Sequence, residues 1–241
     1  MSKSLFNHKN FYIAHAFIYT KKTLLMKRIY KLTLVALIAF SSTSLFAQSP
    51  VKFGIDAGVN LSNASVGDSD GVDKKAKVGF QVGVVAEYEF AQDFFIQSGL
   101  SFTNKGTKLE EKNSAGKVSL SIHQAYLQLP VYAAYKLEVT PTMKIVFNAG
   151  PYFAFGVGGK SKLSGSITDE DFGYFEGSGK VDTFGDKGIL NRFDFGLGGG
   201  VGAEFGQIFV GLKYELGLSD IGKEDLSYKN RSASLTVGYR F

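Results

Sequence analysis

The 241-residue chain contains no cysteine and no tryptophan, and only four of its residues are proline. The absence of cysteine excludes a disulfide framework, a thiolate metal site, a cysteine nucleophile and a lipid-anchored cysteine. Phenylalanine, tyrosine and glycine are plentiful in contrast, with 22, 12 and 29 residues. High glycine with many aromatic residues and no long polar tract indicates many short strands rather than helices or disorder.

A long apolar run that would span a membrane as a helix is also missing. The run Leu32–Phe40 (LTLVALIAF) is shorter than the roughly 20 apolar residues that a membrane helix needs. It follows the basic stretch Met26–Arg28 and precedes a small-residue segment that ends at Ala47. This layout predicts a secretory signal peptide over residues 26–47, with cleavage between Ala47 and Gln48. A retained membrane anchor is the alternative.

Positive charge is concentrated in this N-terminal part of the chain. Residues 1–25 precede a complete signal peptide, and we predict that they are an upstream extension, with Met26 as the true start. The first 47 residues hold seven of the 27 Lys and Arg and none of the 22 Asp and Glu. The predicted mature domain, residues 48–241, therefore has 20 basic and 22 acidic residues, a net charge of −2. The whole chain has a basic pI because of its N-terminal segment. This pI is therefore no evidence that the mature domain binds nucleic acid.

Apolar and polar residues alternate with a period of two in eight segments between Val51 and Phe241. This period is the pattern of strands whose two faces meet different surroundings. The segment Ile208–Leu218 is the most regular. The fourth segment changes phase between Ile122 and Leu127, and a β-bulge near His123–Tyr126 is the predicted cause.

The connections between the eight segments alternate in length. Three are tight turns, at Ala91–Asp93, at Glu138–Thr142 and around Gly206. Four are long and polar: Asn63–Lys77, Asn104–Lys117, Gly158–Ile189 and Asp220–Asn230. Outer-membrane barrels place short turns at the periplasmic end and long loops outside the cell. We therefore predict an all-β protein, a closed eight-stranded antiparallel up-and-down transmembrane β-barrel located in the cell outer membrane.

The alternative is a soluble lipocalin-like barrel, which would bury the apolar face inside. Most strand glycines lie on the polar face. If this face lines the narrow bore of a membrane barrel, the glycines make room for large polar side chains. On the outer surface of a soluble barrel they would only weaken the strands. Aromatic residues gather near the tight turns, as an interfacial girdle requires; they are Phe90, Phe94, Tyr135, Phe205, Tyr239 and Phe241. The terminal Tyr239 and Phe241 also resemble the signal read by the outer-membrane assembly machinery. These features favour contact with outer-membrane lipid.

The polar face carries charges of both signs. We predict that ten of them line the bore: Lys52, Asp56, Glu87, Glu89, Lys144, Asp194, Glu204, Lys213, Glu215 and Arg240. Buried charges need partners, and an eight-stranded barrel is just wide enough to be filled by side chains. The prediction is therefore a packed network of ion pairs, and a narrow path for ions or small solutes is the alternative.

Several segments resemble those of PorT-type outer-membrane barrels. They are Tyr126–Tyr135 (YLQLPVYAAY), Ala149–Tyr152 (AGPY), Phe193–Leu197 (FDFGL) and Tyr214–Leu218 (YELGL). The resemblance covers the chain from about Val51 to Phe241. It implies an eight-stranded barrel from a bacterium of the Bacteroidota type, and it is specific for the fold rather than for an activity.

Candidate chemistry is sparse. Ser119, Ser121 and His123 share one strand face, and a Ser–His pair could activate a hydroxyl in a lipid A-modifying hydrolase, but no orienting acid is evident. Asp68, Asp70 and Asp73 do not match a complete calcium loop. We predict no enzyme activity, cofactor or metal. The expected role is structural or partner-binding through extracellular loops, with Phe172, Tyr174 and Phe175 as contact candidates.

Overall fold

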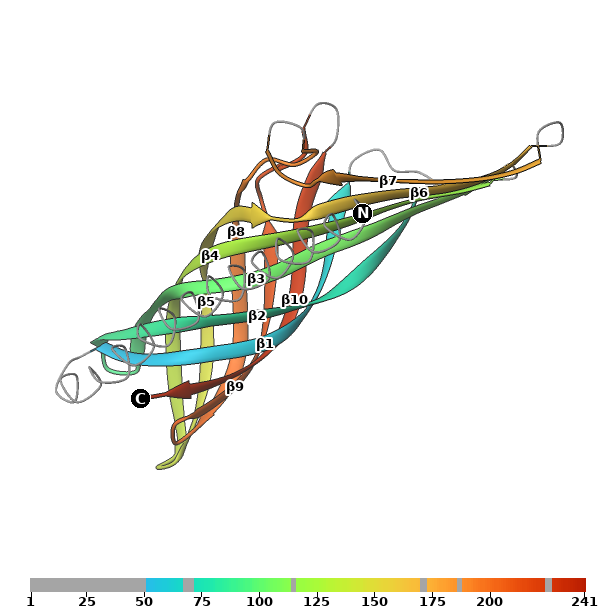
Figure 1. Cartoon of the computed structure of the whole chain (residues 1–241). Helices are drawn as coiled ribbons and strands as arrows, with labels where there is room; N and C mark the ends of the chain where they lie inside the picture. Colours follow the sequence, from blue (N-terminus) through green and yellow to red (C-terminus); the bar gives the residue numbers. More distant parts are fainter. Residues whose placement is uncertain (1–50, 67–71, 114–115, 170–172, 186–187, 224–226) are drawn as a thin grey trace, which may run out of the picture. The chain divides into compact units, whose positions relative to one another are not determined.

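The computed structural model describes residues 51–66, 72–113, 116–169, 173–185, 188–223 and 227–241. The predicted upstream extension and signal peptide lie outside these residues, as do Asp68, Asp70 and Phe172. Every regular element in the described ranges is a strand (Figure 1): β1 Val51–Val66, β2 Val72–Ala91, β3 Phe94–Asn113, β4 Gly116–Thr140, β5 Met143–Gly158, β6 Lys160–Asp169, β7 Gly173–Asp182, β8 Phe193–Phe205, β9 Ile208–Gly217 and β10 Tyr228–Arg240. Within these ranges no helix is long and apolar enough to cross a membrane.

Eight of the ten strands form a closed antiparallel ring. Their order is β3-β2-β1-β10-β9-β8-β5-β4, and β3 pairs with β4 to close it. The ring confirms the predicted eight-stranded up-and-down barrel. The three predicted tight turns are present, and two of them use left-handed backbone conformations, at Asp93 (φ 63°) and Gly206 (φ 59°). Asp and Gly tolerate this conformation better than most residues do.

Three of the four segments predicted as long loops are largely strand, which corrects the sequence-based prediction, whereas the described part of Asp220–Asn230 is mostly loop, with strand only from Tyr228. The β3–β4 hairpin runs on to Asn113 and Gly116, β2 begins at Val72, and Gly158–Ile189 contains the β6–β7 hairpin. Hydrophobic alternation marks a strand only where its two faces meet different surroundings. Backbone pairing continues beyond that zone, where polar residues on both faces hide it.

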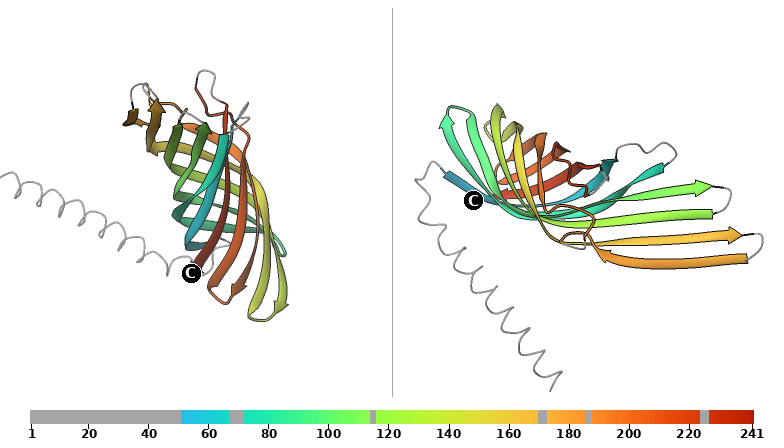
Figure 2. Two further views of the ribbon diagram at one scale, coloured as in Figure 1. Left: turned by 90° about the vertical axis from the view of Figure 1, so that its right-hand side faces the viewer. Right: turned by 90° about the horizontal axis from the view of Figure 1, so that it is seen from above.

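The extra hairpin enlarges one side of the barrel mouth. Strand β6 pairs with Gly116–Ile122 of β4, along the same edge that pairs with β5 closer to the tight turns. The outer parts of β2, β3 and β4 together with β6 and β7 thus form a sheet beyond the ring, here called the extension sheet. It leans away from the barrel rather than closing over its mouth (Figures 1 and 2). Strand β7 is its edge.

The two faces of the ring differ sharply in polarity. Along β10 buried and exposed residues alternate without interruption, and from Ala233 onward the exposed positions are apolar or aromatic residues such as Leu235 (46% exposed) and Val237 (53%). The buried positions are mostly polar, among them Asn230 and Ser232. The apolar face therefore points outward and the polar face lines the bore.

The phase change in β4 has a different origin from the predicted bulge. Strands β3 and β4 keep one register from Phe94 opposite Tyr135 to Asn113 opposite Gly116. The register does shift between Ala125 and Tyr126, but on the β5 side. Strand β4 therefore does not turn over: Ile122 points inward and is fully buried, while Leu127, 42% exposed, points outward. The apolar face itself changes sides.

Candidate functional site: the filled bore

The structure places seven of the ten predicted bore charges inside the ring: Asp56, Glu87, Asp194, Glu204, Lys213, Glu215 and Arg240. The other three lie at the tight-turn end. Lys52 and Glu89 are exposed there, and Lys144, 37% exposed, pairs with Glu138. Their strands continue past the packed part of the bore, so solvent reaches these side chains.

A first network crosses the bore toward the tight-turn end. Lys136 of β4 donates to Glu87 of β2 at 2.5 Å and to Glu204 of β8 at 2.6 Å. Arg240 of β10 binds Glu87 at 3.1 Å and Asp56 of β1 at 2.5 Å. Three carboxylates therefore hold two cations, and only 4% of the Lys136 side chain is exposed. Such pairing is what allows charges to be buried at all.

Aromatic rings and amides complete this layer. The Lys136 ammonium lies 4.6 Å from the ring centre of Phe95 on β3, and the Arg240 guanidinium lies 4.9 Å from that of Phe209 on β9. Gln97 donates to Glu87, and Asn148 of β5 donates to Gln97. All eight ring strands therefore contribute a side chain to one connected layer.

A second network is centred on Glu215 of β9. Its carboxylate accepts bonds from Lys105 at 3.0 Å, Lys213 at 2.7 Å and Gln128 at 2.7 Å. Tyr132 adds a longer bond at 3.3 Å. The Lys105 ammonium, itself buried, also lies 4.6 Å from the ring centre of Tyr152. The second network therefore has one carboxylate and two lysines, a net charge of +1. This charge balances the net charge of −1 of the first network, which has three carboxylates and two cations.

An apolar cap closes the bore at the loop end. It consists of Ala64, Ile122, Tyr126, Tyr152, Ala154, Phe184, Leu190, Ile221 and Tyr228. Phe184 and Leu190 come from the segment between β7 and β8, and Ile221 from the segment between β9 and β10. Asp194 accepts bonds from Asn230 at 2.8 Å and Ser219 at 3.0 Å, and Asn230 donates in turn to Tyr126 of the cap.

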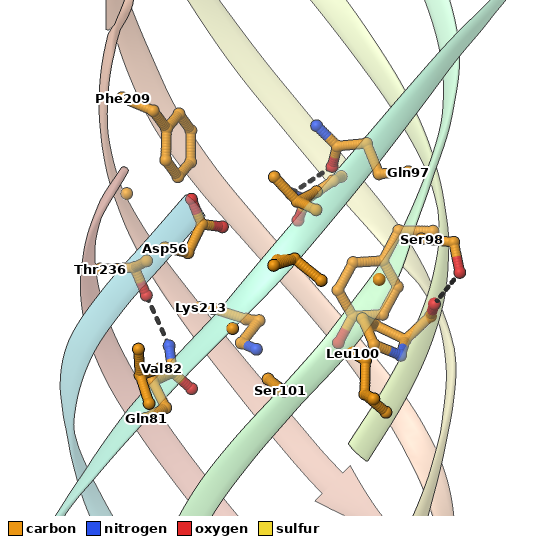
Figure 3. Close-up of a pocket in the computed structure, with 18 of the residues that line it drawn as sticks. Asp56, Gln81, Val82, Gln97, Ser98, Leu100, Ser101, Phe209, Lys213 and Thr236 are labelled. Carbon is orange, nitrogen blue, oxygen red and sulfur yellow. Dashed lines mark hydrogen bonds between the residues drawn. The ribbon is translucent and has the colours of Figure 1, made fainter. Parts of the chain in front are cut away.

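A cavity of about 100 Å³ lies beside these layers (Figure 3). Asp56, Gln81, Gln97, Lys213 and Thr236 are among the side chains that line it, and Gln81 donates to Thr236 at 2.7 Å. Apolar side chains such as Val82 and Leu100 line the cavity as well, and it has the volume of a few water molecules.

Glycines make room for the large bore side chains. A Cβ atom at Gly198 would lie 2.4 Å from the Tyr132 hydroxyl, and one at Gly196 would lie 2.7 Å from the Tyr152 ring. Both distances are shorter than any normal contact. The glycine-rich run of β8 therefore accommodates the two tyrosines that pack around Glu215 and Asp194.

Sequence reasoning missed two cations that are central to the networks, Lys105 and Lys136. Lys136 stands between outward-facing Tyr135 and Leu137, so strict alternation along β4 was the signal that could have found it. Lys105 lies in the segment that was predicted as a loop, where polar neighbours on both sides erase the alternation.

The Ser–His hypothesis receives no support from the geometry. Ser121 and His123 lie on the outer face of β4, and both contact the Lys77 ammonium, at 2.8 and 2.6 Å. Lysine rather than histidine is thus the partner of Ser121. Among the described side chains, no carboxylate forms a hydrogen bond with His123. The described residues also contain no cluster of three or more potential metal ligands.

Comparison with protein-family models identifies the class of barrel. The family described as "Outer membrane protein beta-barrel domain" matches residues 46–222. This chain belongs to that family. It is therefore an integral outer-membrane β-barrel protein, and its exposed apolar face meets lipid.

Solved structures of outer-membrane proteins resemble this family member. The Ail protein of Yersinia pestis in complex with the heparin analogue sucrose octasulfate is 20% identical, with a TM-score of 0.39, covering 79% of this chain and 99% of that one. Neisserial surface protein A is 14% identical, with a TM-score of 0.40, covering 78% and 97%. A search of curated proteins gave no match.

Membership in this family explains the reversal along β4. Inside the bilayer the outer face must be apolar, as at Leu127. Beyond the bilayer the outer face meets water, and Ser121, Ser119 and Lys117 occupy it. The inner face is then the sheltered one, and it carries Ile122 and Leu120. We place the outer surface of the bilayer near Ala125, where the change occurs.

Proposed function

We propose that this protein is a closed, non-conducting outer-membrane barrel that serves as a rigid anchor for its extracellular extension sheet. The bore, filled by ion pairs and by the apolar cap, carries this proposal. The Lys136 and Glu215 networks each reach across the ring, and the cap follows them toward the loop end. An ion would have to break buried pairs at two levels, at a cost of several kcal/mol each.

A narrow channel for ions or small solutes is the second candidate. The cavity of about 100 Å³ beside the networks supports it, because rearranged side chains could join the cavity to either end. The two candidates differ in a single measurable property, the conductance of the unliganded protein.

The purified full-length protein in planar bilayers is expected to show no discrete single-channel openings, because both networks and the cap block the bore. Insertion is verified separately by heat-modifiable gel migration of protein recovered from the same lipid. A known porin in identical bilayers controls for sensitivity. Reproducible unitary steps above the lipid background would replace the closed-barrel proposal with the channel.

The extension sheet is the proposed contact surface. Its inner face carries exposed apolar side chains, among them Val118 (43% exposed), Leu163 (51%) and Val181 (49%). Strand β7 leaves one edge unpaired in the described part of the chain, and open edges accept further strands. Tyr174 and Phe175 were predicted as contact residues, and their side chains are not among those that the structure describes.

The orientation can be tested with single cysteines, because the natural chain has none. Ser178→Cys in β7 is expected to react with a membrane-impermeant maleimide in intact cells. Gln92→Cys in the turn after β2 is equally exposed but is expected to react only after lysis. Labelling of Gln92→Cys in intact cells would invert the assigned topology.

We also propose processing and assembly steps for this chain. The layout of residues 26–47 supports cleavage between Ala47 and Gln48, and the intact mass of protein from outer membranes tests it. The exposed rings of Tyr239 and Phe241, 5.6 Å apart at the end of the ring, support recognition by the assembly machinery, which a chain ending at Arg240 would lose. The motifs Tyr126–Tyr135 and Tyr214–Leu218 support a place in the PorT-type branch.

A further inference from the structure

A row of lysines crosses the outer face of the extension sheet. Lys75 of β2 lies opposite Lys108 of β3, which lies opposite Ser121 of β4. Ser121 lies opposite Lys162 of β6, and Lys162 opposite Lys180 of β7. Residues directly opposite on paired strands share a face. With strands about 4.8 Å apart, four lysines and one serine form a line roughly 19 Å long.

This row contains like charges in direct opposition, which destabilises a sheet. The first pair is compensated by Glu110, which binds Lys75, Lys108 and Lys117. The bonds from Lys108 and then Lys75 hold the pKa of Glu110 well below its ordinary value. No described carboxylate binds Lys162 or Lys180, which are exposed. That pair repels unless an anion from outside lies between the two ammonium groups.

A pocket adjoins the row at the bilayer surface. It has a volume of about 260 Å³ and is lined by Lys77 and His123 together with the apolar Val78 and Phe80. The Lys77 ammonium contacts Ser121 at 2.8 Å, which links the pocket to the row. Val78 and Phe80 are 79% and 50% exposed. The site therefore combines the Lys77 ammonium with exposed apolar side chains.

The position of the row relates it to the membrane. Ser121 lies four residues beyond Ala125, or about 13 Å along the strand. The row is thus on the outward continuation of the lipid-facing surface. Because the extension sheet leans away from the barrel (Figures 1 and 2), this outer face is turned toward the bilayer surface. Anionic groups of the outer leaflet lie at this level.

We propose that this basic face binds the phosphate groups of anionic lipid in the outer leaflet. Phosphate accepts charge-assisted bonds from Lys77, Lys162 and Lys180, and Val78 and Phe80 take the first part of an acyl chain. The exposed Val78 and Phe80 and the continuity with the lipid-facing wall favour a lipid over a soluble polyanion. The proposal does not depend on closure of the bore, since a conducting barrel would carry the same surface.

The test measures binding of bisphosphorylated lipid A, and of lipid A with its phosphates removed, to the full-length protein in detergent by native mass spectrometry. One variant combines Lys77→Gln, Lys162→Gln and Lys180→Gln. A control removes the same charge elsewhere, with Lys52→Gln, Lys74→Gln and Lys144→Gln. Lys74 lies on the opposite face of the extension sheet, and the other two lie at the tight-turn end.

A lysine at a membrane surface changes affinity by about fivefold, so the first variant is expected to bind roughly 100-fold more weakly. The control variant is expected to bind lipid A as tightly as the natural protein does. The natural protein is expected to bind dephosphorylated lipid A as weakly as the first variant binds lipid A. Glu110→Gln frees three lysines and is expected to bind about fivefold more tightly, which keeps the test decisive if the triple variant folds poorly.

Three results would overturn the proposal. They are equal losses in the two triple variants, equal binding of phosphorylated and dephosphorylated lipid, or no gain from Glu110→Gln. A heparin oligosaccharide provides the remaining arm: if it binds through the same lysines while lipid A does not, the ligand is a soluble polyanion and the lipid assignment is wrong.

Discussion

Replacing Lys136 with methionine is expected to destabilise the barrel by about 3–5 kcal/mol, because the variant removes the shared cation of two buried carboxylates. Glu87 keeps Arg240 as a partner, but Glu204 has no other ion pair in the described residues. Methionine has nearly the same length as lysine, so the effect measures lost charge rather than a cavity. Unfolding in urea, with protein refolded into vesicles and followed by circular dichroism, measures it.

Lys144→Met is the matched control for this prediction. Lys144 lies on the same face of the neighbouring strand, but its partner Glu138 is 55% exposed, and exposed pairs contribute less than about 1 kcal/mol. Adding Glu204→Gln to Lys136→Met is expected to recover part of the loss, because a neutral amide replaces the unpaired carboxylate. Equal effects of Lys136→Met and Lys144→Met would show that solvent reaches the bore.

Leu190→Ala is expected to loosen the apolar cap without opening the ring. Leu190 is fully buried in the cap, and such a truncation removes about 2–5 kcal/mol. Its amide donates to Thr183, and the Asn191 amide donates to Ile221, at 2.9 and 2.7 Å. Hydrogen exchange of these two amides should become roughly 30-fold faster or more, since local opening governs it.

Leu197→Ala serves as the comparison for the cap. Leu197 lies on the lipid-facing side of β8 and is 49% exposed, so lipid fills the space that its side chain leaves. Exchange of the Leu190 and Asn191 amides should then remain at the natural rate. If Leu190→Ala leaves both amides equally protected, the segment between β7 and β8 is held by something other than the cap.

Most of the barrel strands could be predicted because the sequence of each strand shows the two-residue alternation by itself. In β10 every outward position is exposed and every inward position buried, so a local period of two suffices. The tight turns at Asp93 and Gly206 were likewise visible in the sequence. The same rule failed for Leu120 and Ile122, because the surroundings of the outer face change from lipid to water along one continuous strand.

The bore was predictable in kind but not in detail. Bore residues such as Glu215 and Arg240 followed from alternation, whereas the partners that they find depend on how the ring closes. Arg240 and Glu87 are 153 positions apart, and Lys105 and Glu215 are 110 apart. No local pattern relates such residues, since their distance depends on barrel radius and strand stagger.

The sequence by itself determined that strands alternate, that glycine and charge share the inner face, and that apolar side chains turn to lipid. These properties follow from the two-residue period of a strand and from the solvent on each side. Only the tertiary structure decided which cation meets which carboxylate, how the cap closes the bore and where the lysine row runs. Those features join strands whose register is set by closure of the whole ring, because every backbone group at a sheet edge must find a partner inside the bilayer.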